Sequence, residues 1–336
     1  MSGQVDTFGT APDGSAVLRA RIEGGGMSAA IMTWGASLQD LRMRGVGHPL
    51  VLGAPDLAPY LTVMRHFGAI AGPVANRIAG GRAPLDGQIL QFDRNERDRT
   101  TLHGGAQGTS RSNWTLDEAG SDRCRLSIRL PDAWCGFPGP MEIAATYRLD
   151  PEGALVLELE ASTAAPTFCN LAHHSYWCLD GSGSIDSHRL TIPAESYLPV
   201  DADLIPQGGP VPVAGTRFDF RAPRAVTAPG EAGVDHNFCL RDATGLRTAC
   251  VLTGVGLCLT VTTTEPGLQV YDGSGMNTGS VAGLGGHPYG PRAGIALEPQ
   301  RWPDAPNRPD FPSVRLDPGQ VYRQVSRFHV RREGSA

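Results

Sequence analysis

The stretch "ALVLELEA", residues 154–161, alternates apolar and charged side chains in a way that decides the fold class. Its leucines occupy every second position, and Glu158 and Glu160 occupy positions between them. Because successive side chains of a β-strand point to opposite faces, this alternation predicts a strand with one buried face and one solvated face. It is typical of an antiparallel sheet that covers a core on one side only.

Further segments repeat this pattern along the chain, separated by turns rich in Gly, Pro and Asp. They are residues 16–22, 124–130, 142–149, 189–193, 249–264 and 267–273. Helical periodicity is confined to a short stretch at 56–64, so we predict an all-β fold, a large antiparallel sandwich or barrel with few short helices.

The organisation of the chain favours one domain over residues 1–336, because neither a low-complexity linker nor a break in composition interrupts it. The Pro-rich stretch 298–319 contains aromatic and acidic residues, so we expect an ordered loop there, followed by a strand at 321–330.

Composition excludes several classes of function. The chain has a net charge of −5 and no basic stripe, which argues against a nucleic-acid partner. Residues 1–14 lack the basic and apolar regions of a signal peptide, and no apolar run is long enough to cross a membrane. The seven cysteines form no C-x-x-C pair, which argues against a zinc knuckle or a disulfide framework. We therefore expect a cytoplasmic protein without a membrane partner.

The sequence contains no lysine, so all 29 basic residues other than histidine are arginine. A lysine Schiff base, a pyridoxal phosphate linkage and a P-loop lysine are therefore impossible in this chain. Any chemistry must rest on Arg, His, Asp, Glu, Tyr or Cys, and we expect neither a cofactor nor a metal.

The segment "FCNLAHHSYWCLDG", residues 168–181, contains two adjacent histidines. If it is extended, His174 shares a face with Asn170 and Tyr176, whereas His173 points the other way. One imidazole alone can then face a given cavity, so the two do not chelate one ion. A buried histidine satisfied by a backbone carbonyl is the alternative interpretation.

Other polar residues gather where strands end. Taken singly, each is equally explained by a turn, a cap or a solvated charge. They are Asn76 and Arg77 beside a glycine pair, His103 before two glycines, Asp235 at the start of a strand, Gln269 on one face of a strand, and Glu298 at a strand end.

Six segments, in their order along the chain, resemble those of the aldose 1-epimerases (galactose mutarotases), over about residues 24–330. They are "GPVANRIAGGRAPLDG" (72–87), "LHGG" (102–105), "NLAHHSYWCLDG" (170–181), "VDHNFCL" (234–240), "GLQVYDG" (267–273) and the segment 294–322 that begins "GIALEPQRW". The resemblance implies a galactose mutarotase-like β-supersandwich with a sugar site on its concave face. It also implies a cofactor-free isomerase that interconverts the α and β anomers of a free aldose.

The resemblance also implies residue roles. His174 matches the family's general acid and Glu298 its general base. The sugar-binding positions match Arg77, His103, Asp235 and Gln269, with Asn76 and Tyr176 beside them. Such an acid–base pair suits the chemistry, because mutarotation removes a proton from the anomeric hydroxyl and delivers one to the ring oxygen. His174 must then start protonated, and we expect Asp235 to hold its charge.

Three departures from the family pattern bear on which sugar is preferred: Pro73 in place of Arg, Trp177 in place of Phe, and "EPQRW" in place of "ETQHF". The expected partner is a monosaccharide, and the chain is expected to be a monomer or homodimer.

Three other functions stay open at this point. A glycoside hydrolase would use Asp235 and Glu298 as its two carboxylates. A non-catalytic sugar-binding sandwich would need no acid–base pair. A hexose-6-phosphate 1-epimerase would contact the phosphate through Arg77, Arg292 or Arg301.

Overall fold

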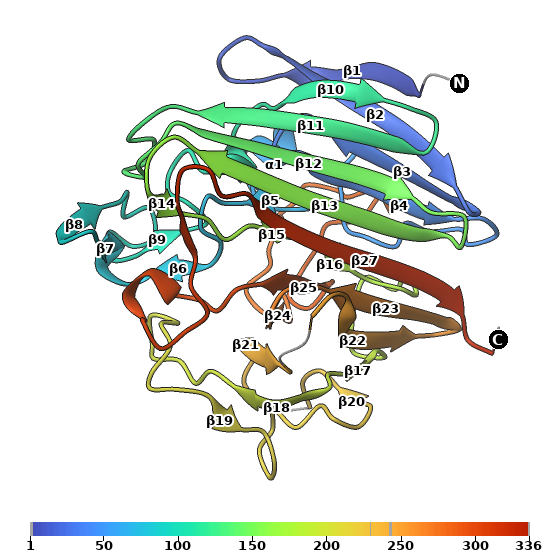
Figure 1. Cartoon of the computed structure of the whole chain (residues 1–336). Coiled ribbons are helices and arrows are strands. Elements are labelled where there is room, and N and C mark those ends of the chain that lie inside the picture. The colour runs from blue at the N-terminus through green and yellow to red at the C-terminus, as the bar shows by residue number, and fades with distance from the viewer. Residues whose placement is uncertain (1–2, 229, 242–243, 335–336) are drawn as a thin grey trace.

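The computed structural model describes residues 3–228, 230–241 and 244–334. Most of its regular structure is antiparallel sheet, which confirms the predicted all-β fold (Figure 1). The largest sheet has nine strands, in the spatial order β10 (Thr115–Ala119), β11 (Arg123–Leu130), β12 (Met141–Leu149), β13 (Ala154–Thr163), β27 (Tyr322–Arg332), β23 (Leu257–Thr263), β22 (Arg247–Gly254), β17 (Arg189–Thr191) and β20 (Arg224–Ala225).

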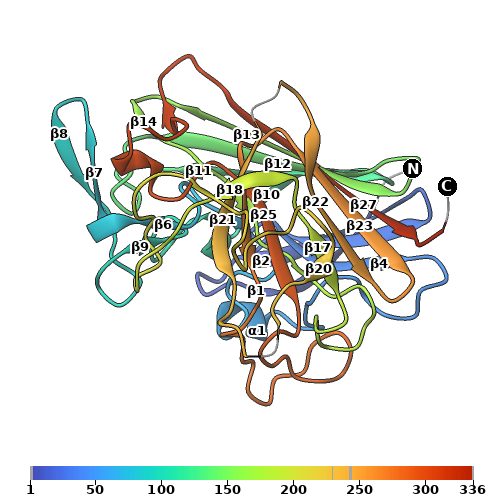
Figure 2. The same ribbon diagram turned by 90° about the horizontal axis from the view of Figure 1, so that it is seen from below.

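Two smaller sheets accompany the nine-stranded one (Figures 1 and 2). The four-stranded sheet has the order β1 (Gln4–Thr10), β2 (Ala16–Gly24), β3 (Met27–Met32) and β4 (Ser37–Met43). The six-stranded sheet has the order β16 (Tyr176–Trp177), β25 (Ile295–Gln300), β24 (Gly267–Tyr271), β21 (Asp235–Leu240), β18 (Ala194–Tyr197) and β19 (Val211–Pro212).

Short two-stranded ladders complete the fold. They pair β5 (Ile70–Ala71) with β15 (Ala172–His173), β6 (Arg77–Ile78) with β9 (Thr101–Leu102), β7 (Arg82–Leu85) with β8 (Gln88–Gln91), and β14 (Thr167–Phe168) with β26 (Arg315–Leu316). The helical elements are α1 (Ala58–Leu61), which falls in the one stretch with predicted helical periodicity, and the 3₁₀ turns η1 (Ala79–Gly81), η2 (Thr109–Arg111) and η3 (Ala305–Asn307). The β7–β8 hairpin projects from the body in both views.

The decisive stretch forms strand β13, near the middle of the nine-stranded sheet. Leu155, Leu157 and Leu159 are at most 1% exposed and belong to the main apolar core, whereas Glu158 is exposed. The core also contains residues of β27, β23 and β22 and residues of the six-stranded sheet. It therefore fills the space between the nine-stranded and six-stranded sheets, as the alternation predicts.

The six-stranded sheet has two different faces. Trp177, Leu297 and Val270 point into the main core. Glu298 and Gln269 alternate with these apolar residues and stand opposite each other in register, so they share the other face. The apolar face anchors the sheet, and the polar face is available for chemistry.

No helix within the described part of the chain is long and apolar enough to cross a lipid bilayer. The Pro-rich stretch after Glu298 is ordered and includes η3 and β26, as expected. Strand β27 follows it and pairs with both β13 and β23.

Candidate active site

A cavity of about 450 Å³ opens on the polar face of the six-stranded sheet. Such a volume is within the ~300–1,000 Å³ typical of small-molecule pockets. Seven of the eight predicted site residues line it, and the eighth, Gln269, contacts it through Asp235. The lining residues among the predictions are Asn76, Arg77, His103, His174, Tyr176, Asp235 and Glu298.

Asn76 and His103 hold each other in two tight turns. Both adopt a positive φ, of 59° and 50°. The His103 N–H donates to the Asn76 carbonyl at 2.9 Å, and the Asn76 N–H donates to His103 Nδ1 at 3.2 Å. The following Gly104 is required, because a Cβ there would lie 1.9 Å from the carbonyl oxygen of Gly72. Because Gly104 has no side chain, the backbone of Gly72 can lie close to it. The turn therefore packs against the chain before Asn76.

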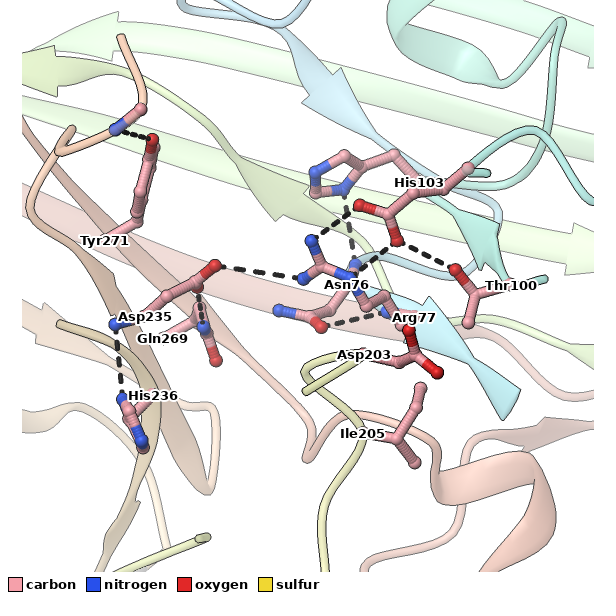
Figure 3. A network of polar contacts seen from close by, with 12 residues as sticks. Asn76, Arg77, Thr100, His103, Asp203, Ile205, Asp235, His236, Gln269 and Tyr271 are labelled. Atoms are coloured by element: carbon pink, nitrogen blue, oxygen red, sulfur yellow. Dashed lines mark hydrogen bonds and ion pairs between the residues drawn. The ribbon is translucent and has the colours of Figure 1, made fainter. Parts of the chain in front are cut away.

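Arg77 is held by two carboxylates (Figure 3). Its Nε and Nη2 donate to Glu96 at 2.7 and 2.8 Å, and its Nη1 lies 3.9 Å from Asp235 Oδ2. Glu96 also accepts a hydrogen bond from the Thr100 hydroxyl at 2.7 Å. Bidentate pairing fixes the plane of the guanidinium, so Arg77 presents its donors to the cavity in one orientation.

Asp235 lines the cavity and is hydrogen-bonded to β24, the strand that pairs with the strand of Glu298. Its Oδ1 accepts a hydrogen bond from Gln269 Nε2 at 2.6 Å, as Figure 3 shows. Burial raises the pKa of Asp235, while Arg77 and Gln269 act in the opposite direction. Gln269 stands opposite Glu298 in register, and it therefore holds Asp235 close to β25, the strand that carries Glu298.

His174 and Glu298 face each other in the deepest part of the site. His174 Nε2 lies 3.6 Å from Glu298 Oε1, and the two side chains are 7% and 3% exposed. Burial lowers the pKa of His174 to about 4. Burial and the charge of Asp235 raise the pKa of Glu298 well above its usual range, and Arg77 opposes that shift. A titratable acid and a titratable base thus lie close together, both largely buried.

Four hydrogen bonds fix the chain segments that carry this pair. The His174 N–H donates to the Ala69 carbonyl at 2.9 Å, and the Gly68 N–H donates to the His174 carbonyl at 3.0 Å. Asn170 donates to the Arg301 carbonyl and accepts from its N–H, at 3.1 and 2.8 Å. Asn170 therefore ties the histidine segment to the chain just after Glu298, and it does not line the cavity as its place on the His174 face suggested.

The other histidine of the pair points away, as alternation predicts. His173 is 1% exposed, and its ring packs against Tyr147 and Phe328 at 6.0 and 5.3 Å. Its Nε2 lies 2.9 Å from the Ser175 hydroxyl, rather than near a backbone carbonyl. His173 is a core residue, and His174 is the one that faces the cavity.

Two expectations need correction. The carboxylate next to His174 is Glu298, whereas Asp235 interacts with Gln269 and Arg77. Burial lowers the pKa of His174, so a protonated His174 depends on a neighbouring negative charge. Arg292 pairs with Asp186 at 3.3 Å, and Arg301 bonds the Ser313 carbonyl, so neither lines the cavity as a phosphate contact.

Glu96 and His66 are among the residues at the site that were not predicted. Glu96 orients Arg77, and His66 lines the cavity beside His103, with ring centroids 4.8 Å apart. No local pattern marks either one. His66 reaches the site because β5 pairs with β15, a contact between residues about a hundred positions apart.

Cys178, Asp180 and His188 form the one group of potential metal ligands among the described residues. The Leu179 N–H already donates to His188 Nε2, and Asp180 accepts from the Ser187 hydroxyl. Because Nε2 accepts this hydrogen bond, a neutral His188 carries its proton on Nδ1. Nδ1 is the nitrogen that would remain for a metal. Hydrogen bonding accounts for this cluster.

Taken together, a β-sandwich with a buried histidine–carboxylate pair among hydrogen-bonding side chains fits an enzyme of the acid–base type. The family model for aldose 1-epimerase matches residues 19–329, and the chain belongs to that family. As a member, it is an isomerase that interconverts the anomers of an aldose.

Individual relatives agree over nearly the whole chain. The galactose mutarotase of Rattus norvegicus is 38% identical over 333 residues, which covers 96% of each chain. The aldose 1-epimerase of Escherichia coli K12 is 32% identical over 341 residues, which covers 96% of this chain and 98% of the other. The crystal structure of an aldose epimerase homologue from C. elegans superposes with a TM-score of 0.87 at 27% identity, covering 94% of this chain and 99% of that one.

Proposed function

We propose that this protein opens and recloses the ring of a free aldose, with Glu298 as the base that removes the anomeric proton and His174 as the acid that protonates the ring oxygen. The observation that carries the proposal is the contact between His174 Nε2 and Glu298 Oε1, 3.6 Å apart in a buried cavity. A second feature supports it, since Glu298 Oε2 has no hydrogen-bond partner within the described residues and can receive a sugar proton.

The reaction balances with these two groups alone. Glu298 takes the proton of the anomeric hydroxyl, the C1–O5 bond breaks as C1=O forms, and His174 gives its proton to O5. After rotation about C1–C2, O5 attacks the other face of the aldehyde. Glu298 then returns a proton to O1, and His174 recovers the proton of O5, which restores both groups.

This cycle makes the pair alternate between two states with the same single proton. Glu298 is ionised and His174 protonated with the cyclic sugar, whereas Glu298 is protonated and His174 neutral with the open sugar. Burial by itself favours the second state, because both groups are then uncharged. Arg77 lowers the pKa of Glu298 and so reduces the free-energy difference between the two states.

The remaining wall residues would bind the sugar hydroxyls. Arg77, His103, Asn76, Asp235 and Tyr176 present donors and acceptors around the cavity. Gln269 would act with Asp235, to which it is bonded. The expected substrate is an unmodified aldose, because Arg77 already meets two carboxylates and no other arginine lines this cavity.

The deciding experiment is polarimetry of freshly dissolved α-anomers of galactose, glucose, xylose, arabinose and fucose. Galactose comes first, because several relatives carry the name galactose mutarotase. We expect the approach to equilibrium to accelerate in proportion to enzyme concentration after subtraction of the spontaneous rate, and to persist in EDTA. Sugar binding without acceleration would support a lectin, release of reducing sugar from an aryl glycoside a hydrolase, and preference for glucose 6-phosphate over glucose the phosphate variant.

We also propose that the protein acts in the cytoplasm. All seven cysteines lie in described residues, and none forms a disulfide bond. Such a pattern is typical of a reducing compartment. Fractionation of the native cells, followed by immunodetection, tests this proposal.

A further inference from the structure

His66 occupies the wall of the catalytic cavity without a role in the mechanism above. Its ring centroid lies 4.8 Å from that of His103 and 6.0 Å from that of His174. A second cavity of about 520 Å³ adjoins the first and shares His66, Tyr176 and Tyr271 with it. His66 therefore lies where the two cavities meet, next to His103.

The partner of its Nδ1 fixes which nitrogen of His66 carries the proton. Nδ1 lies 3.0 Å from the Ser110 hydroxyl, and Ser110 is 1% exposed. Among the described residues, the imidazole is the only hydrogen-bond partner of this hydroxyl. A buried hydroxyl hydrogen needs an acceptor, so Ser110 donates to Nδ1. The neutral ring then carries its hydrogen on Nε2.

His103 reaches the same tautomer by a different contact. The backbone N–H of Asn76 donates to its Nδ1, so a neutral His103 carries its hydrogen on Nε2. Both rings are neutral because burial lowers their pKa, to about 3 for His66. Two adjacent imidazoles thus each offer one N–H donor and no positive charge beside the acid–base pair.

We propose that His66 is a further sugar-binding residue, held by Ser110 as an Nε2–H donor, and that it binds a sugar hydroxyl oxygen next to the one bound by His103. The proposal rests on the proposed function of the cavity. It assigns one contact to a sugar hydroxyl on the side that adjoins the second cavity. Ser110 is a positioning residue, because it does not line the cavity and acts through the ring.

The tautomer is testable without any measurement of activity. Long-range ¹H–¹⁵N spectra of the wild-type protein with ¹⁵N-labelled histidine report which ring nitrogen is protonated. We expect His66 to show protonated Nε2 and unprotonated Nδ1, and Ser110→Ala to give a mixture of the two tautomers. A protonated Nδ1 in the wild type would overturn the proposal.

The contact to sugar is tested with His66→Phe, which keeps an aromatic ring and removes the donor. The loss of one neutral hydrogen bond predicts a roughly three- to ten-fold fall in kcat/KM, mostly through KM. The matched control is His287→Phe, at an exposed histidine outside both cavities, which should leave kcat/KM unchanged. Thermal melts of both variants check that they fold.

Deoxy analogues of the preferred aldose identify the hydroxyl. For one analogue, wild type and His66→Phe should have equal kcat/KM, because the bond is already absent; for the others the three- to ten-fold gap should persist. A gap of the same size for every analogue, or no gap for the intact sugar, would overturn the proposal. Absence of mutarotation in the wild type would instead overturn the proposed function.

Discussion

His174 Nε2 and Glu298 Oε1 lie 3.6 Å apart, although the two side chains come from segments more than a hundred residues distant in sequence. The contact exists because β16, directly after His174, pairs with β25, and because Asn170 bonds the backbone at Arg301. Backbone pairing and one buried amide therefore set the distance between the two groups that we propose transfer protons.

Glu298→Gln keeps the shape of the side chain but cannot accept a proton. We expect kcat to fall by about 10²- to 10⁴-fold, the usual contribution of general acid–base catalysis, with a much smaller change in KM. Polarimetry with the spontaneous rate subtracted measures both. The control is Glu265→Gln, another buried glutamate that does not line the cavity. Near-wild-type kcat in a folded Glu298→Gln would remove the base from the mechanism.

Arg77→Ala should show the opposite pattern. In the proposed mechanism the guanidinium binds sugar and does not transfer protons, so KM should rise more than kcat falls. Glu96→Gln removes the charge that orients Arg77 but leaves the arginine in place, and it should raise KM in the same direction by a smaller factor. If Glu96→Gln changed kcat alone, the pair would not act through substrate binding.

His174→Asn should be severe, whereas His173→Asn should retain most of the turnover. The two rings occupy opposite faces, and His173 contacts Tyr147 and Phe328 in the core. His173→Asn should therefore lower thermal stability, since it leaves a gap in a packed region. Equal losses of kcat at matched folding would show that the assignment of the two rings is wrong.

The sequence alone predicts the strands and the facing of the two histidines for a physical reason. Alternation is local, so Leu155, Leu157 and Leu159 reveal a half-buried strand, and adjacent His173 and His174 must diverge wherever the chain is extended. These predictions need no knowledge of what packs against them, and the structure confirms them.

Proton states and partners were not predictable in the same way. The lowered pKa of His174 was not visible in the sequence, because burial depends on residues that arrive through sheet pairing. Glu96 and His66 were not predicted, because each reaches the site through contacts between strands or loops that are distant in sequence. The resemblance to a family named residues that line one cavity, but it could not state how His174 and Glu298 share a proton.

Gly104→Ala tests the turn that presents His103. Gly104 has φ of 81°, and an added Cβ would meet the Gly72 carbonyl oxygen at 1.9 Å. Strain at positive φ costs about 1–3 kcal/mol, and the backbone clash adds to it. We expect a clear drop in melting temperature by calorimetry. Gly87→Ala, at positive φ with open space around it, is the matched control and should cost less. Equal effects would show that the clash contributes nothing.

The pH profile of kcat/KM tests whether the His174–Glu298 pair works with one shared proton. A second proton on the pair leaves Glu298 protonated, so it cannot act as the base. Loss of the single proton leaves His174 neutral, so it cannot act as the acid. The profile should therefore be bell-shaped. Because the pKa of His174 is lowered to about 4, the acid limb should lie well below the ordinary histidine range. The raised pKa of Glu298 should move the alkaline limb far above the ordinary carboxyl range.

The same profile in Glu298→Gln separates the two groups. This variant has no carboxylate to protonate, so lowering the pH cannot disable a base. The acid limb should therefore disappear. The residual rate still needs protonated His174 and should fall as pH rises through its own lowered pKa, which moves the descending limb to lower pH. Burial lowers the pKa of His66 and His103 as well, so neither adds a limb in the ordinary histidine range. Stopped polarimetry at constant ionic strength, with buffer catalysis subtracted, measures both profiles. An unchanged bell in Glu298→Gln would show that the titrating pair lies elsewhere.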